Sequence, residues 1–118
     1  MTGPRDADCL FCKIVAGEVP ADIVHQSDAT IAFRDITPQA PVHVLVIPRS
    51  HYPNAVELAA AEPDTAIDLL NTVAKVAEQE HLGEGYRLVF NTGSRANQVV
   101  FHAHAHVLGG RDMNWPPG

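Results

Sequence analysis

The sequence predicts an α+β domain with a mostly antiparallel sheet of about five strands. Residues 42–48 are apolar and rich in β-branched side chains, as in a buried strand. Residues 99–108 place a histidine at every second position between small apolar residues, and two residues is the period of a strand. Residues 63–81 have the apolar spacing of one long helix. With a short helix and a hairpin before residue 42, this order of elements is typical of α+β proteins.

The first part of the chain has short elements separated by turn-forming residues. Residues 1–8 are polar and predict a flexible lead-in, so we expect the folded domain to span residues 9–118. Helical spacing predicts a short helix over Cys9–Ala16, with a glycine directly after it. Two short apolar runs, 22–26 and 30–33, flank a Ser-Asp turn and predict an antiparallel hairpin.

The second half of the chain predicts two helices and one more strand before the histidine stretch. Asn54 is suited to cap a short helix that ends at Ala60, and Pro63 is suited to the first turn of the long helix. Residues 86–91 predict the strand, and the polar residues 92–98 predict a loop after it. The apolar stripe that we expect the long helix to bury is Ile67, Leu70, Val73, Ala74 and Ala77.

Composition and charge exclude several classes of protein. With 118 residues and 46% hydrophobic side chains, the chain can form one domain with a proper core. The 14 acidic and 8 basic residues give a formal net charge of −6 without any basic run, so we expect no nucleic-acid partner. No apolar stretch approaches 18 residues, and the N-terminus has no signal-peptide pattern. We therefore expect no membrane association and a cytoplasmic location.

The three histidines of the 99–108 stretch are the strongest indication of chemistry. His102, His104 and His106 leave the same face of a strand, and the small apolar residues between them need a core behind the other face. One metal ion shared by all three is the main alternative. However, His102 and His106 start about 13 Å apart along a strand, so they cannot share an ion with His104 unless the strand bends sharply. We therefore expect the three side chains to have different roles.

The residues alone leave two kinds of reaction open. A neutral imidazole is a good nucleophile toward phosphorus, and a second imidazole can orient the first. The loop at 92–98 contains Gly, Ser and Asn, and it offers backbone N–H groups to an anion near Asn91 and His104. Phosphoryl or nucleotidyl transfer and hydrolysis by a three-histidine metal site are both compatible with these residues.

The two cysteines, Cys9 and Cys12, form a C-x-x-C motif. In a reducing compartment this spacing is more typical of metal or redox chemistry than of a structural disulfide. The alternative is a pair of buried free thiols.

Several motifs resemble the histidine triad (HIT) superfamily, and in particular its histidine triad nucleotide-binding (Hint) branch. The run His102-Ala-His104-Ala-His106-Val-Leu matches the superfamily signature of alternating histidines and apolar residues. The other matching segments are residues 11–14, 35–41, 45–48, 107–111 and 115–118. The similarity covers roughly residues 9–118 and implies a HIT-like fold, which is a five-stranded, mostly antiparallel sheet with one long helix and a short N-terminal helix.

The resemblance implies an enzyme that acts on the α-phosphate of purine nucleotides of the AMP or GMP type. The expected activity is that of an adenosine 5′-monophosphoramidase-like hydrolase or nucleotidyl transferase that forms a covalent nucleotidyl-histidine intermediate. By the resemblance, His104 would be the nucleophile and His106 would help to hold the phosphate. His43 would belong to the supporting hydrogen-bond set.

The resemblance also implies how the nucleotide binds. Asp35 would bind the ribose hydroxyls, and Ile36 would pack on the purine. Asn91 and the backbone around Gln98 and Val99 would line the phosphate pocket.

Two positions depart from the Hint pattern. The branch often has a serine where this chain has Val99, with its hydroxyl directed at the phosphate, so the rate and the help to the leaving group are in question. Asn97 stands where a glycine is usual, and asparagine tolerates a left-handed backbone better than most residues. Two alternatives stay open: a dinucleoside polyphosphate hydrolase, and a nucleotide-binding interaction module with vestigial catalysis.

In some members of the superfamily, a C-x-x-C near the N-terminus binds zinc together with two histidines. One of these follows the Ile-Pro strand end and the other is the first of the triad, so the resemblance implies a site of Cys9, Cys12, His51 and His102. Two thiolates and two imidazoles fit a tetrahedral site with no open position for water, so we expect this zinc to be structural. No organic cofactor is expected.

The C-terminal tail, residues 111–118, indicates a homodimer. It carries the only tryptophan, Trp115, next to two prolines, and tryptophan is enriched at interfaces. A short sheet also leaves edges that a second copy could cover, and the long helix offers a second surface. The Hint resemblance implies the same arrangement, with Trp115 in the cleft of the neighbouring subunit. The alternative is that Trp115 packs on its own domain.

Overall fold

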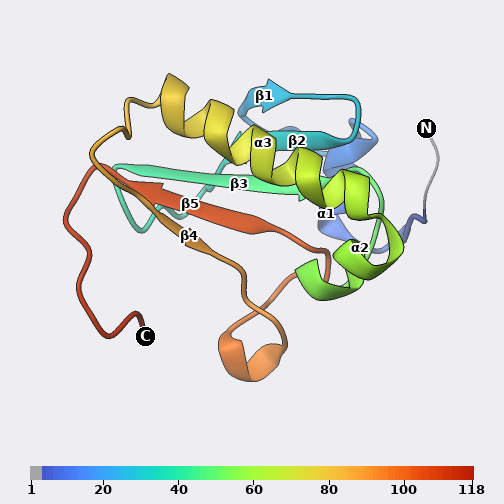
Figure 1. Ribbon diagram of the computed structural model, residues 1–118. Helices are drawn as coiled ribbons and strands as arrows, with labels where there is room; N and C mark the ends of the chain where they lie inside the picture. Colours follow the sequence, from blue (N-terminus) through green and yellow to red (C-terminus); the bar gives the residue numbers. More distant parts are fainter. Residues whose placement is uncertain (1–3) are drawn as a thin grey trace.

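The helices of the chain pack against one five-stranded antiparallel sheet (Figure 1). The computed structural model describes residues 4–118, and residues 1–3 lie outside the described part. The strands are β1 (Ile23–Gln26), β2 (Thr30–Arg34), β3 (Val42–Pro48), β4 (Arg87–Val89) and β5 (Ala105–Gly109). The helices are α1 (Leu10–Val15), α2 (Ala55–Ala61) and α3 (Pro63–Gln79), with a short 3₁₀ helix at Ser94–Ala96. The strand order is β1-β2-β3-β5-β4 with every pair antiparallel, so the predicted α+β class is confirmed.

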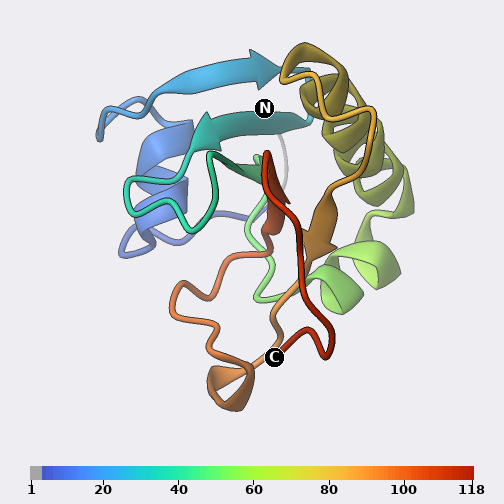
Figure 2. The ribbon, with the colours of Figure 1, turned by 90° about the vertical axis from the view of Figure 1, so that its left-hand side faces the viewer.

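The helices divide between the two faces of the sheet. Helices α2 and α3 cover one face, and α1 lies against the other (Figure 2). Along the central strand β3, Val44 and Val46 pack into the core under α3, whereas Leu45 and Ile47 pack into the core under α1. Because both faces of β3 are buried, its sequence is a continuous apolar run rather than an alternating one.

Local signals predicted most element boundaries correctly. The hairpin is formed by β1 and β2, and the run at 42–48 is β3. Gly17 follows the C-cap of α1 with φ = +77°, as expected of a helix-ending glycine. The side chain of Asn54 caps α2 by accepting the Glu57 N–H at 2.9 Å. The predicted strand at 86–91 is shorter than expected, since β4 covers only Arg87–Val89.

The predicted buried stripe of the long helix is wrong for three of its five members. Ile67 and Leu70 are 58% and 50% exposed, and Ala74 is exposed as well. The side chains that α3 buries are Leu69, Thr72, Val73, Val76 and Ala77. The helix carries apolar residues on two adjacent faces at the same spacing, so the period identified a helix but could not decide which face meets the sheet. The remaining apolar face is left on the surface.

The histidine stretch is a strand over only part of its predicted length. Pairing of β5 with β3 begins at Ala105, opposite Val46, and residues 99–104 have no strand structure. The ladder ends there because β3 closes with Pro48, which has no N–H to donate. The Ala103 N–H donates instead to the carbonyl of Tyr52 at 2.7 Å.

The predicted alternation of the stretch nevertheless holds. Ala103, Ala105 and Val107 are buried in the core under α3. The rings of His102 and His104 lie on the opposite side, against Phe11 of α1. Small apolar residues on one side and imidazoles on the other are therefore kept even where the backbone leaves the sheet.

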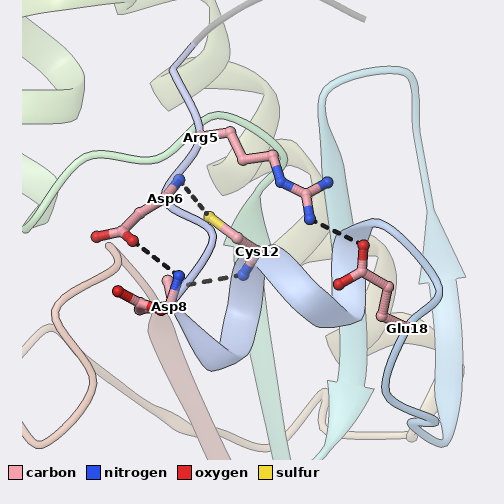
Figure 3. A network of polar contacts seen from close by, with 6 residues as sticks. Arg5, Asp6, Asp8, Cys12 and Glu18 are labelled. Carbon is pink, nitrogen blue, oxygen red and sulfur yellow. Dashed lines mark hydrogen bonds and ion pairs between the residues drawn. The ribbon is translucent and has the colours of Figure 1, made fainter.

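The segment before α1 is held to the rest of the protein over its described residues. Arg5 forms an ion pair with Glu18 at 3.0 Å, and the Asp8 N–H donates to the carboxylate of Asp6 (Figure 3). The carbonyl of Pro4 accepts the His51 N–H at 2.6 Å. Residues 4–8 of the predicted lead-in thus contact the domain, and the first three residues lie outside the described part. Across residues 4–118, none of the helices combines the length and the apolar character that crossing a bilayer requires.

Candidate active site and metal centre

Four potential metal ligands from three separate parts of the chain meet beside the first turn of α1. Cys9 and Cys12 come from the start of α1, His51 from the loop after β3, and His102 from the segment before β5. Their ligand atoms all lie within 4.8 Å of one another. The Nδ1 of His102 is 3.5 Å from Cys9 Sγ, 3.6 Å from Cys12 Sγ and 3.2 Å from His51 Nδ1. The structure thus brings together the four residues that the resemblance implied.

The orientation of the His102 ring fits a metal ligand. The ring is fully buried, and its Nε2–H donates to the Pro48 carbonyl at 2.8 Å, which leaves the Nδ1 lone pair directed at the cluster. A hydrogen bond from the second ring nitrogen to a backbone carbonyl is the usual way to fix the tautomer of a metal-binding histidine. Two thiol sulfurs and two imidazole nitrogens are a tetrahedral zinc donor set, and the four residues fit that ion.

Backbone N–H groups at the start of α1 orient the two thiols. The Sγ of Cys9 caps the helix by accepting the Cys12 N–H at 3.5 Å. The Sγ of Cys12 accepts the Asp6 N–H at 3.4 Å (Figure 3). Burial raises the pKa of the Cys12 thiol. A metal-bound thiol is deprotonated, so a cation in this site would offset the cost of burying the sulfur.

A hydrogen bond to the backbone fixes the ring of His104. Its Nδ1–H donates to the backbone carbonyl of His102 at 2.7 Å, which leaves a lone pair on Nε2. The ring packs edge-on against Phe11, with 5.1 Å between the ring centroids, and it is 7% exposed. Burial lowers the pKa of His104, which favours the neutral ring. A neutral imidazole with a free Nε2 lone pair is the form that attacks phosphorus.

A chain of hydrogen bonds fixes the protons of the other two histidines. The Gln39 N–H donates to Nδ1 of His43 at 3.0 Å, so the proton of His43 is on Nε2. That Nε2–H donates to Nδ1 of His106 at 2.9 Å, which places the proton of His106 on its own Nε2. Among the described residues, this buried Nε2 has no hydrogen-bond partner. Burial, with help from the neighbouring His104 and His43, lowers the pKa of His106 to about 4.

This chain of hydrogen bonds argues against a second metal centre. Ligand atoms of Asp35, His43 and His106 lie close enough together to hold an ion. However, the nitrogens that face this group are a protonated Nε2 on His43 and the Nδ1 on His106 that accepts from it. Asp35 already accepts the Thr37 N–H at 2.8 Å, and its other oxygen lies 3.5 Å from Nε2 of His43. The carboxylate therefore faces a hydrogen-bond donor, and the group does not fit a cation.

An apolar cavity of about 600 Å³ lies beside these histidines, on the face of the sheet that α1 covers. Phe33, Leu45 and His106 stand opposite one another on successive strands, so they form one continuous floor. Ile36 and Val99 also line the cavity, and they are 99% and 78% exposed. The remaining lining residues are Leu10, Phe11, Ile14, Val19, Pro20, Ala21, Asp22, Arg34, Asp35, Val100 and His104. This volume is in the range of small-molecule sites.

Three other predicted binding residues, Asn91, Gln98 and Trp115, do not line this cavity. Trp115 is 81% exposed. The side chain of Gln98 is buried and occupied, because it accepts the Gly93 N–H and donates to the carbonyls of Pro53 and Val100. It closes the 92–98 loop on itself, and the Gln98 N–H also donates within the loop, to the Gly93 carbonyl at 3.1 Å.

The predicted tolerance of Asn97 for an unusual backbone is confirmed. This residue has φ = +66° and ψ = +32°, in the left-handed region. Asparagine adopts that region more readily than most residues do. The loop therefore keeps the conformation for which the usual glycine is suited.

Sequence reasoning missed two groups of this site. Phe11 contacts the rings of both His102 and His104. In the sequence it lies between two cysteines on a short predicted helix, and this position indicates only a core residue. The Gln39 N–H sets the protons of His43 and His106, yet a backbone donor leaves no trace in the residue type. The proline-rich segment that carries Gln39 was the only available signal.

Comparisons with known proteins agree with this geometry. The model of the HIT domain matches residues 16–113. The adenylylsulfatase HINT1 of Arabidopsis thaliana is 47% identical over 118 residues, which cover 98% of this chain and 80% of that protein. A 14 kDa zinc-binding protein of Brassica juncea is 46% identical over 113 residues, which cover 94% of this chain and all of that protein. The crystal structure of a HIT family hydrolase from Legionella pneumophila Philadelphia 1 superposes with a TM-score of 0.89 at 46% identity, covering 94% of this chain and 100% of that one. A family model that spans most of the chain, relatives near half identity and the shared fold establish that this chain belongs to the HIT family.

Proposed function

We propose that this protein hydrolyses purine nucleotides that carry an amine or ester on the α-phosphate, through a nucleotidyl-His104 intermediate. The observation that carries the proposal is the pairing of two opposite nitrogens at one cavity. His104 offers an unprotonated Nε2, and His106 offers an Nε2–H that is buried without a partner. A lone pair for phosphorus and a donor for a phosphoryl oxygen are what an in-line displacement needs.

In the first step, the Nε2 lone pair of His104 attacks the α-phosphorus. The bond from phosphorus to the leaving nitrogen or oxygen breaks, and its electron pair stays on the leaving group. The Nε2–H of His106 donates to a phosphoryl oxygen as charge develops there. Val99 has no hydroxyl to pass on a proton, so water at the open mouth of the cavity protonates the leaving group.

In the second step, water attacks the phosphorus of the nucleotidyl-His104 intermediate. The P–N bond breaks, its electron pair returns to Nε2 of His104, and the proton of the attacking water passes to solvent. The products are the nucleoside monophosphate and free enzyme. Val99 and Ile36 line the cavity and are exposed to solvent, so water can enter there after the leaving group departs.

The cavity has the composition that a nucleoside needs. Its apolar walls, formed by residues such as Ile14 and Phe33, suit a purine ring, and Ile36 would cover the ring from the solvent side. The carboxylate of Asp35 lines the same cavity and would accept hydrogen bonds from the ribose hydroxyls. Asn91 and the backbone N–H of Val99, next to Gln98, would complete the phosphate end.

Turnover of three compounds tests this proposal against its alternatives. An adenosine phosphoramidate should be hydrolysed faster than a diadenosine polyphosphate, and the reverse order would favour a dinucleoside polyphosphate hydrolase. AMP binding with no hydrolysis above that of His104→Ala would favour an interaction module. His104→Ala should abolish both turnover and the covalent nucleotidyl-protein that mass spectrometry detects. His81→Asn is the matched control, because His81 is exposed at the end of α3, outside the cavity, and its φ of +59° suits asparagine.

Zinc at the Cys9, Cys12, His51 and His102 cluster is the second part of the proposal. When bound, the ion supplies a cross-link between α1 and the loops beside the sheet and takes no part in the displacement, because the protein fills all four positions. A relative of this chain is named a zinc-binding protein, which supports the assignment. Elemental analysis of protein purified without chelators should give about one zinc per chain, and a folded chain without zinc would contradict it.

A homodimer is the third part of the proposal. The outer face of α3 exposes Ile67 and Leu70, and Tyr86 and Phe90 flank the edge strand β4 with 42% and 36% exposure. Trp115 adds another exposed aromatic side chain on the tail, whose backbone is held by the bond from Arg87 to the Asn114 carbonyl at 2.8 Å. An uncovered apolar helix face and an unpaired strand edge each suit a self-complementary contact.

The state of association tests this part. Sedimentation should show a dimer at micromolar concentration, and removal of residues 112–118 should leave a dimer with altered preference for the leaving group. A monomeric native protein would refute the dimer. A truncated protein that is less stable but has an unchanged preference would place Trp115 on its own domain.

A further inference from the structure

A smaller cavity adjoins the one beside the histidines. It has a volume of about 310 Å³, and Leu10, Val99 and Val100 line both cavities. The remaining residues around the smaller cavity are Asp6, Asp8, Cys9, His51 and Phe101. We propose that the smaller cavity is the subsite for the leaving group, and that its walls select an apolar amine or alcohol over one that carries a phosphate chain. The inference rests on the proposed function and deepens it, because that function leaves the place of the leaving group open.

The smaller cavity lies toward the end of the site that a bound nucleoside would leave free. The Asp35 N–H donates to the His43 carbonyl at 3.0 Å, beside the start of β3 and therefore beside the end of β5. Val99 belongs to the segment that precedes β5, and His104 and His106 follow it along this segment. With the ribose at Asp35 and the α-phosphate at the two histidines, a substituent on the phosphate has the walls around Val99 next to it.

The apolar side chains where the two cavities meet are open to solvent. Leu10 of α1 is 46% exposed, and Val99 and Phe101 are 78% and 49% exposed. They come from two segments that are far apart in the sequence and meet at one cavity. Exposed apolar side chains gathered in a hollow indicate a binding surface. Because two of the three also line the larger cavity, the occupant that fits is the remainder of the same substrate and not a separate molecule.

Two carboxylates in the smaller cavity determine what the subsite rejects. Asp6 and Asp8 precede α1, where the Asp6 carboxylate accepts the Asp8 N–H at 2.9 Å (Figure 3). Among residues 4–118, no basic side chain forms an ion pair with either carboxylate, and the neighbouring Arg5 is paired with Glu18 at 3.0 Å. The other polar groups of the cavity belong to the metal cluster, in which two thiolates would balance the charge of a zinc ion. A phosphate chain would therefore meet negative charge without a cation to pair with.

Three adenosine phosphoramidates test the subsite in the unaltered protein. Their amines are ethylamine, 2-phenylethylamine and a 2-phenylethylamine that carries a phosphonomethyl group on the ring. We expect kcat/KM to be about 10-fold higher for the phenylethyl compound than for the ethyl compound, because covering about 60 Å² of apolar surface contributes that factor. The phosphonate compound should lose this advantage, most strongly at low ionic strength.

Variants of Phe101 test the apolar wall, because this side chain lines only the smaller cavity. In Phe101→Ser, the ratio of kcat/KM between the phenylethyl and ethyl compounds should fall at least about threefold. The affinity for AMP, measured by calorimetry, should change less than about twofold. Comparing one ratio across proteins cancels the difference in basicity between the two amines. Phe101→Leu should keep most of the ratio.

Ile23→Ser is the matched control for Phe101→Ser. Ile23 is 43% exposed on the edge strand β1 and lines neither cavity, so its loss should leave the ratio at the wild-type value.

Asp8→Asn tests the charge, because it keeps the size of the side chain and removes one negative charge. It should raise kcat/KM for the phosphonate compound about threefold at low ionic strength, with a smaller effect in high salt. Asp28→Asn is its control. It makes the same change of charge at an exposed position between β1 and β2, outside both cavities, and should have no effect on this substrate.

A folded Phe101→Ser protein that binds AMP and keeps the wild-type ratio would overturn the inference. Equal turnover of the phenylethyl and phosphonate compounds by the wild type would overturn it as well. In both cases the compounds are still hydrolysed, so the proposed function stands. If Phe101→Ser does not fold, the wild-type series and Asp8→Asn decide the question. Hydrolysis that persists in His104→Ala would instead overturn the proposed function.

Discussion

Single backbone groups determine which ring nitrogen carries the proton in the histidines of the candidate site. The Gln39 N–H determines the proton position on His43, and His43 determines it on His106. The carbonyl of His102 does the same for His104. His43, His104 and His106 therefore differ in which ring nitrogen carries the proton, which is Nε2 in His43 and His106 and Nδ1 in His104.

Stability should fall in mild acid because His106 is buried in its neutral form. Its pKa is lowered from about 6.5 to about 4, so between these values the unfolded chain binds a proton that the folded chain does not. The free energy of unfolding therefore decreases as the pH falls from about 6.5 toward 4. His106→Gln should remove about 2 kcal/mol of this decrease.

Urea unfolding at pH 7.5 and pH 4.5 measures the difference for each protein. Thr72→Val is a suitable control: it removes a buried hydroxyl from α3 that does not titrate, so it should lower stability equally at both pH values. If the free energy of unfolding of His106→Gln fell between pH 7.5 and pH 4.5 as much as that of the wild type, the assignment of a neutral buried His106 ring would be contradicted.

The left-handed backbone at Asn97 predicts opposite effects for two substitutions. Asn97→Gly should change stability by less than about 0.5 kcal/mol, because glycine has no side chain to clash at φ = +66°. Asn97→Val should cost about 1–2 kcal/mol, since a β-branched residue is strained there. Thermal unfolding measures both, and Ala96→Val, at a neighbouring exposed position in the 3₁₀ helix, controls for the added methyl groups. Equal losses for the two valine variants would show that the backbone angle is unimportant.

Helix α3 has one apolar face buried against the sheet and a second apolar face exposed. It packs Leu69 and Val76 against the sheet, while Ile67 and Leu70 point outward. The inner face belongs to the core under α3, which also contains Leu58 of α2 and Val44 of β3. The outer face has no such cover in one chain, so the two apolar stripes of one helix should respond differently to mutation.

Two adjacent leucines give a matched pair for this prediction. Leu69→Ala should lower the free energy of unfolding by about 2–5 kcal/mol, because Leu69 is 2% exposed in a packed core. Leu70→Ala should cost less than about 1 kcal/mol of chain stability, because half of that side chain is exposed. It should instead weaken the proposed dimer, which sedimentation equilibrium measures. Equal stability losses without any change in association would mean that α3 is rotated from the orientation described.

At the scale of the whole molecule, the candidate metal cluster brings together three segments that also contact one another directly, as in the hydrogen bond from Ala103 to Tyr52 and the packing of Phe11 on His102. It connects the start of α1, the loop after β3 and the segment before β5, which are far apart in sequence. The sheet and α3 form one body without it, whereas α1 sits on the opposite face with a smaller core of its own. A zinc ion bound by these four residues would contribute to folding stability, because it would bind the folded chain and not the unfolded one.

Removal of the metal should therefore destabilise the protein as a whole. Dialysis against a chelator should lower the thermal midpoint by several degrees, and added zinc should restore it. Arg5→Ala is the control from the same segment. It breaks only the exposed ion pair with Glu18, which should be worth less than about 1 kcal/mol (Figure 3). A chelator-treated protein with an unchanged midpoint and no bound zinc would show that the cluster does not hold a structural ion.

The sequence by itself determined the features that depend on neighbouring residues. The apolar run of β3, the turn of the β1–β2 hairpin, the cap at Asn54 and the two-residue period of the histidines are all local, and each was predicted correctly. The resemblance of several motifs to one family added the candidate site residues, and the structure places the four implied metal ligands within 4.8 Å of one another.

Only the tertiary structure decided the features that depend on distant partners. Which stripe of α3 is buried depends on the sheet beneath it, because both stripes have the same period. Residues 99–104 lie outside the sheet because Pro48, at the end of β3, has no backbone N–H to donate to them. The proton positions on His43, His104 and His106 follow from backbone groups whose chemistry is the same in every residue type except proline. A sequence specifies the side chains, but the backbone donors and acceptors that direct them are assigned only when remote segments pack together.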